Sequence, residues 1–204
     1  MGSLEEYLNL DLRTSSGLRP QDLDAFLQGA PLSGLGSAFI QAERRYGVNA
    51  RYLCAHAVLE SGWGTSRIAR DKYNLFGFGA YDKNPYKYAR SFDSFEQCID
   101  VVAEYIARHY LNPNGKYYNG PTLPAMNKNY ATDPNWARKI AQLMTQITEK
   151  ASSQPGKEVP PSGDEQATEV PPEKQVSAQH ARRRPQEAKT RRHKMFHLFG
   201  LKRR

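Results

Sequence analysis

The sequence has only two cysteines in 204 residues, Cys54 and Cys98, and it has no long apolar run. Two cysteines are too few for a disulfide framework, and they lack the spacing of a zinc site. Both fall in helical apolar patterns, so we expect buried, unpaired thiols. No run approaches the roughly 20 apolar residues of a membrane helix, and the first residues lack the basic-then-apolar order of a secretory signal. We therefore expect neither a membrane span nor an export signal in this sequence.

Acidic residues are fewer than basic ones, and the formal net charge is +8 at pH 7. The last 54 residues hold 12 Lys and Arg against six Asp and Glu, which leaves 17 against 15 in residues 1–150. A nearly neutral domain has too little positive charge to follow a nucleic-acid backbone. We therefore expect no specific nucleic-acid partner.

The composition divides the chain into a domain over residues 1–150 and two further segments. Residues 151–179 are rich in Pro, Ser, Glu and Gln and contain no Leu, Ile or aromatic residue, which predicts a disordered linker. Residues 180–204 hold ten Lys and Arg against one Glu and end in a cluster of apolar residues. Such a basic tail favours an anionic wall polymer or membrane surface as its partner.

Apolar residues before position 150 recur mostly with the period of a helix, which predicts a mainly α (α+β) fold. The segment 73–92 is aromatic, contains glycine and lacks this period, so it predicts a loop or short hairpin beside a groove. Helices are predicted over residues 20–27, 34–46, 50–60, 95–110 and from Pro134, with Asp133 as its N-cap, to about 147.

The most informative stretch is residues 55–64 (AHAVLESGWG). It places a carboxylate, Glu60, at the end of an apolar helix and one residue before two glycines and a tryptophan. Burial beside apolar groups raises the pKa of a Glu side chain, as a general acid working near neutral pH requires. His56 lies one turn earlier on the same side of the helix, close enough to touch Glu60. Without a further ligand at suitable spacing, we expect a structural His56 and no metal.

This stretch resembles the glucosaminidase family of bacterial peptidoglycan hydrolases, glycoside hydrolase family 73, in which a helix ending in Glu-Ser/Thr-Gly-Trp/Asn-Gly carries the catalytic acid. The resemblance covers roughly residues 8–148 and leaves the tail outside. The other matching segments follow in the family's order and are 10–14 (LDLRT), 46–49 (YGVN), 73–82 (YNLFGFGAYD), 84–85 (NP), 91–92 (SF), 114–118 (NGKYY) and 126–137 (MNKNYATDPNWA).

The resemblance implies a lysozyme-like helical body with a smaller aromatic lobe and a substrate groove between them. It also implies hydrolysis, at the bacterial cell wall, of the β-1,4 bond that follows N-acetylglucosamine in peptidoglycan glycan strands. Glu60 corresponds to the family's catalytic acid, and Tyr130 matches a family tyrosine implicated at the sugar site. We expect a monomer that needs no cofactor.

The second catalytic group is left open. The segment that carries a Glu on a long hairpin in one branch of the family is short here and contains no Glu. Asp82 and Asp93 are the available carboxylates, and Asp82 is preferred because it lies within a matching motif. Carboxyls about 5–5.5 Å apart indicate a retaining enzyme and about 6.5–9.5 Å an inverting one, while a substrate acetamido group can replace the nucleophile.

Aromatic residues are concentrated in the segments expected to flank the groove, where rings can stack on the apolar faces of sugars. Core packing is the alternative role for each ring. The candidates for sugar contact are Trp63, Tyr73, Phe76, Tyr81 and Tyr118.

Three other functions compete with the glucosaminidase interpretation. A lytic transglycosylase resembles this fold but carries Gly-Leu-Met-Gln where this chain has Asn-Leu-Phe-Gly at residues 74–77. A muramidase cuts the other bond of the same glycan. A non-catalytic wall-binding module needs no acid at all.

Overall fold

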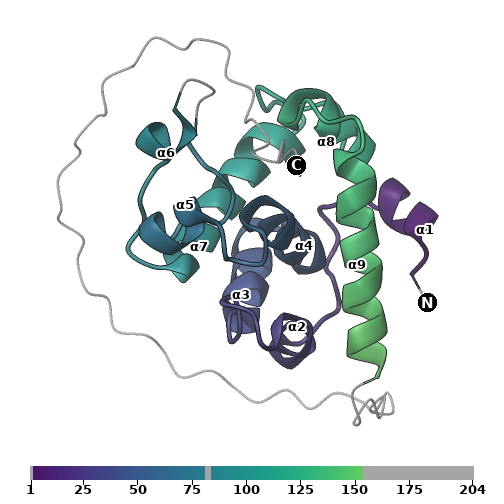
Figure 1. Cartoon of the computed structure of the whole chain (residues 1–204). Coiled ribbons are helices and arrows are strands. Elements are labelled where there is room, and N and C mark those ends of the chain that lie inside the picture. The colour runs from purple at the N-terminus through teal and green to yellow at the C-terminus, as the bar shows by residue number, and fades with distance from the viewer. Residues whose placement is uncertain (1, 81–83, 154–204) are drawn as a thin grey trace, which may run out of the picture. The chain divides into compact units, whose positions relative to one another are not determined.

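The computed structural model describes residues 2–80 and 84–153, and these residues are helical, with no strand among them (Figure 1). The helices are α1 (Leu4–Asn9), α2 (Pro20–Leu27), α3 (Gly36–Tyr46), α4 (Ala50–Ser61), α5 (Arg67–Lys72), α6 (Pro85–Tyr88), α7 (Phe95–Ile106), the π-helix η1 (Ala107–Leu111), α8 (Leu123–Tyr130) and α9 (Trp136–Ser152).

Helix α4 is the central buried helix, as its composition predicts. The Asn49 side chain caps its first turn by accepting the Tyr52 N–H at 3.1 Å, and Gly62 ends it in the left-handed conformation. Nine of its residues are buried, and it packs against α3 and α9 (Figure 1). Polar side chains on this helix are therefore placed in the interior, where each needs a partner.

Helix α9 packs against α1, α2, α4 and α8. It begins at Trp136 rather than at the predicted Pro134, because residues 133–135 form a turn in which the Asp133 carboxylate accepts the Asn135 N–H at 2.9 Å. The first turn of α9 is instead capped from α8, where the Asn127 Oδ1 accepts the Ala137 N–H at 3.2 Å. The Asn127 amide also donates to the carbonyl of Asp133 at 3.1 Å. One side chain thus fixes α8 against the start of α9.

The C-terminal end of α9 extends beyond the predicted domain boundary, since Ala151 is helical and buried. The predicted tail 180–204, and the predicted linker 151–179 from residue 154 onward, lie outside the described residues.

The described part of segment 73–92 forms turns and the short helix α6. Of the two predicted alternatives, a loop or a short hairpin, this part is therefore a loop. The Asn74 side chain organises this segment. Its amide donates to the carbonyls of Phe78 and Arg90, both at 2.9 Å, and its Oδ1 accepts the Phe78 N–H at 2.9 Å. This small lobe is therefore built around one buried asparagine.

Candidate active site

Glu60 lies in the last turn of α4, directly before a turn in which residues 62–64 all have positive φ, at 57°, 61° and 79°. The Ser61 hydroxyl accepts the Gly64 N–H at 2.8 Å and holds this turn to the helix end. Glycine adopts such a conformation at little cost, whereas for Trp63 it costs of order 1–3 kcal/mol. The turn ends the helix abruptly after the carboxylate and leaves the Trp63 side chain 37% exposed.

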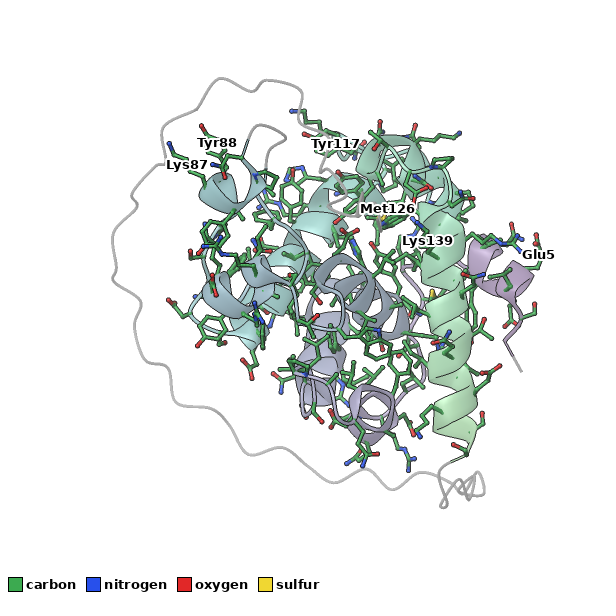
Figure 2. The ribbon with its side chains drawn as sticks, in the orientation of Figure 1. Glu5, Lys87, Tyr88, Tyr117, Met126 and Lys139 are labelled. Carbon is green, nitrogen blue, oxygen red and sulfur yellow. The ribbon has the colours of Figure 1, made fainter. Side chains whose placement is uncertain are left out.

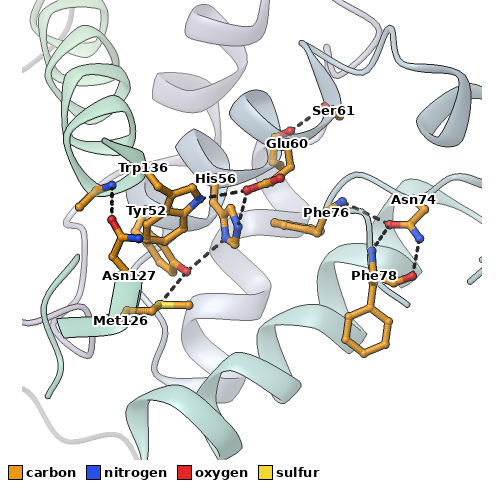
Figure 3. Close-up of polar contacts among 12 residues, drawn as sticks. Tyr52, His56, Glu60, Ser61, Asn74, Phe76, Phe78, Met126, Asn127 and Trp136 are labelled. Carbon is orange, nitrogen blue, oxygen red and sulfur yellow. Dashed lines mark hydrogen bonds and ion pairs between the residues drawn. The ribbon is translucent and has the colours of Figure 1, made fainter. Parts of the chain in front are cut away.

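The Glu60 side chain is only 6% exposed, and its Oε1 atom faces two ring nitrogens (Figure 3). The Trp136 Nε1–H donates to Oε1 at 3.0 Å, and the His56 Nε2 lies 3.5 Å from the same oxygen. The predicted contact between His56 and Glu60 is therefore confirmed. An indole N–H can only donate, so Oε1 must accept, and the proton of the acid form belongs on Oε2.

The imidazole of His56 is fully buried within four aromatic rings. Its centroid lies 4.7 Å from that of Tyr130, 5.1 Å from Phe76, 5.3 Å from Trp136 and 5.4 Å from Tyr52. Phe76, expected to contact sugar, is only 2% exposed and packs against this imidazole instead. Its role is to enclose the site, because a buried ring offers no face to a substrate.

Tyr130, the other predicted site residue on this side, ends α8 and stacks on Trp136 with centroids 4.9 Å apart. Its hydroxyl is buried and has no hydrogen-bond partner among the described residues. Burial, together with the nearby Glu60 carboxylate, raises the pKa of this phenol well above its usual value. Tyr130 therefore remains neutral, and its hydroxyl is a buried donor with no partner among the described residues.

The remaining predicted residues have different surroundings. Trp63 packs on Phe26 with centroids 5.0 Å apart, and Tyr73, 44% exposed, packs on Phe95 at 5.4 Å. Both expose ring area on which a sugar can stack. Tyr118 is half-buried in the loop between η1 and α8.

Of the carboxylate candidates, Asp93 is exposed and accepts a hydrogen bond from the Gln97 amide at 2.8 Å at the start of α7. Asp82 and Tyr81 lie outside the described residues.

Sequence reasoning missed the role of Trp136. It falls within a matching motif, but nothing local links it to a glutamate 76 residues earlier. The sequence offered one signal. Trp136 stands at the start of the apolar face of a predicted helix, and its indole N–H, which can donate but not accept, needs an acceptor once it is buried.

Within residues 2–80 and 84–153, no group of three or more His, Cys, Asp or Glu could hold a metal ion. None of the helices in this part of the chain is long and apolar enough to cross a membrane. Cys54 and Cys98 are buried and unpaired, and burial raises the pKa of the Cys98 thiol to about 12.

A nearly buried carboxylic acid at the end of a central apolar helix, within a helical body of this kind, defines a lysozyme-like glycoside hydrolase fold. The chain belongs to the Glucosaminidase family, described as mannosyl-glycoprotein endo-beta-N-acetylglucosaminidase, whose sequence profile matches residues 36–149. The resemblance seen in the sequence motifs is thus confirmed.

Two curated relatives illustrate the similarity. The beta-N-acetylglucosaminidase of Bacillus subtilis is 37% identical over 132 residues, which cover 55% of this chain and 15% of that protein. The bifunctional autolysin of Staphylococcus epidermidis is 35% identical over 171 residues, which cover 71% and 13%. The chain spans about a fifth or less of the length of the curated relatives that it matches.

Among solved structures, a catalytic mutant of Staphylococcus aureus autolysin E in complex with the disaccharide NAG-NAM is 26% identical, with a TM-score of 0.57. The match covers 72% of this chain and 73% of that one. A structure of a major bifunctional autolysin is 30% identical with a TM-score of 0.57 and covers 72% and 69%.

Proposed function

We propose that this chain is an endo-β-N-acetylglucosaminidase that hydrolyses the β-1,4 bond following N-acetylglucosamine in peptidoglycan, with Glu60 as the general acid. The observation that carries the proposal is the 6% exposed Glu60 carboxyl, whose Oε1 is fixed by the Trp136 N–H at 3.0 Å. The names of the relatives and the NAG-NAM disaccharide bound by autolysin E support the choice of substrate.

The geometry suggests how the acid works. Oε1 accepts the indole N–H, so Oε2 carries the proton that passes to the glycosidic oxygen as the bond breaks. The negative charge left on Glu60 is then stabilised by a donor already in place, without reorganisation. We propose that the Tyr130 phenol, which is buried with no partner among the described residues, donates to the acetamido group or supports developing charge when substrate binds.

For the second group, we retain Asp82, with the substrate acetamido group as the alternative. Trp63, Tyr73, Tyr81 and Tyr118 are proposed to contact the sugar rings.

The test is digestion of purified peptidoglycan followed by reductive labelling of the new ends. N-acetylglucosaminitol ends support the proposal, whereas N-acetylmuramitol ends identify a muramidase and anhydro ends a lytic transglycosylase. Binding to walls without any new ends identifies a wall-binding module.

The matched variant is Glu60→Gln, which keeps the shape of the side chain but has no acidic proton. We expect it to lose about 10²–10⁴-fold in turnover while its melting temperature stays near that of the wild type. Wild-type turnover in folded Glu60→Gln contradicts the assignment.

The basic segment 180–204 is proposed to hold the enzyme, acting as a monomer at the cell wall, on anionic wall polymers or anionic lipid. It carries ten Lys and Arg against one Glu, and each basic residue near an anionic surface contributes about 1 kcal/mol at modest salt. Removal of residues 154–204 should leave turnover of soluble glycan fragments unchanged but weaken pelleting with walls at low salt. Equal pelleting of the full and the shortened chain at low salt contradicts this role. The proposed monomeric state is tested separately by sedimentation of the protein alone.

A further inference from the structure

Three polar side chains of α4 form a column that ends at the proposed acid. Tyr52, His56 and Glu60 are spaced four residues apart, so they lie on one face of the helix. The Tyr52 hydroxyl lies 3.2 Å from the His56 Nδ1, and the His56 Nε2 lies 3.5 Å from the Glu60 Oε1 (Figure 3). Both Tyr52 and His56 are fully buried. Polar groups in such a place stabilise the fold only if they are paired, so their mutual orientation is fixed.

The tautomer of His56 is coupled to its contact with Tyr52. The single hydroxyl proton of Tyr52 has two acceptors at 3.2 Å, the His56 Nδ1 and the sulfur of Met126, a buried residue of α8 (Figure 2). A thioether is a weaker acceptor than a ring nitrogen, so we assign the proton to Nδ1. In the opposite tautomer, Nδ1–H donates to the Tyr52 oxygen and the hydroxyl donates to the sulfur, and the first experiment below distinguishes the two. A neutral imidazole that accepts at Nδ1 carries its own proton on Nε2, the nitrogen that faces Glu60.

We propose that His56 is a positioning residue for Glu60, which Tyr52 holds in the Nε2–H tautomer so that the imidazole and indole N–H groups converge on Oε1. The indole donates a hydrogen bond to Oε1 at 3.0 Å, and the imidazole N–H, 3.5 Å away, acts on the same oxygen through its positive end, at a distance too long for a full hydrogen bond. Together they stabilise the carboxylate that remains after proton transfer and direct Oε2 to the substrate. The inference rests on the proposed role of Glu60 as the acid.

The phenols of Tyr52 on α4 and Tyr130 on α8 also interact with the Glu60 carboxylate. Burial raises the pKa of both phenols well above the usual value, so both stay neutral. Trp136, which reaches Glu60 from α9, does not titrate. These three groups therefore contribute no charge change of their own near neutral pH.

The first experiment reads the tautomer without any substrate. Nitrogen NMR of the ¹⁵N-histidine-labelled full chain, with the His56 signals assigned through His56→Gln, should show an Nε2–H imidazole. An Nδ1–H imidazole overturns the inference whether or not the protein cleaves peptidoglycan.

The second experiment measures the effect on the acid. His56→Phe keeps a ring in the aromatic enclosure but removes the donor, whereas His56→Gln keeps a side-chain N–H. For His56→Phe we expect kcat on soluble glycan fragments to fall about tenfold with KM little changed, and the basic limb of the pH profile to move up by about one unit. His56→Gln should recover most of both effects.

Two further variants provide a second test of the contact and a control. Tyr52→Phe removes the group that orients His56 and should shift the profile in the same direction by less. Tyr7→Phe, which breaks a tyrosine hydrogen bond to Thr148 at 2.5 Å elsewhere, should leave the profile unmoved. Unmoved or acid-shifted profiles in folded His56→Phe and Tyr52→Phe overturn the inference, whereas a wild-type protein without glycosidase activity contradicts only the proposed function.

Discussion

Replacement of Trp136 by phenylalanine separates the indole N–H from the aromatic packing around Glu60. Phenylalanine retains a ring to stack on Tyr130, now 4.9 Å away between centroids, and to face His56 at 5.3 Å, but it cannot donate to Oε1. The lost hydrogen bond is 3.0 Å long and reaches a carboxyl that is 6% exposed. Hydrogen bonds to charged groups are worth about 1.5–3 kcal/mol. Because the charge develops as the acid donates, kcat/KM should fall roughly ten- to a hundredfold.

The assay is kcat/KM on soluble glycan fragments, together with urea unfolding. Trp136 is fully buried, so the smaller ring should also lower the free energy of unfolding by about 1–3 kcal/mol. Phe39→Leu, in the fully buried part of α3, is the control, because it should destabilise the fold and leave kcat/KM near that of the wild type. If Trp136→Phe loses stability but keeps the wild-type kcat/KM, the indole serves only packing and the reasoning about Oε1 is wrong.

Further changes test other parts of the molecule. Asp82→Asn should lower turnover more than Asp93→Asn, because the Asp93 carboxylate is engaged at the start of α7, and equal small losses favour assistance by the substrate acetamido group. Gly64→Ala should lower the free energy of unfolding by about 1–3 kcal/mol, because φ is +79° at this residue and the new Cβ meets the Leu32 side chain at 3.0 Å. An unchanged midpoint of urea unfolding contradicts this prediction. The Cys98 thiol, with a pKa of about 12, should not react with Ellman's reagent at about pH 8 until the protein unfolds, so rapid reaction of the native protein argues against its burial.

The helices were largely predictable because their signals are local. Residues 50–60 are almost entirely apolar between a capping Asn49 and Gly62, and the structure has the helix at Ala50–Ser61. The start of α9 was not predictable in this way. The N–H of its first turn is accepted by Asn127 from another helix, which no pattern around residues 133–136 can reveal.

The candidate site shows the same difference between local signals and contacts from distant segments. The contact of His56 with Glu60 follows from their spacing on one helix. The hydrogen bond from Trp136 and the burial of Phe76 depend on how distant segments pack against α4, and hydrophobicity alone does not distinguish an enclosing ring from one that faces a ligand.

The donor that anchors Glu60 is 76 residues further along the chain, on the last helix of the domain. A nascent or proteolysed fragment that stops after α8 contains the whole of α4 and the proposed acid but lacks the indole that fixes Oε1. Such a fragment holds the reactive group without its orientation, so by the same reasoning its proton donation is weakened until α9 docks. For an enzyme proposed to cut the cell wall, full activity is therefore expected only from a chain that includes α9.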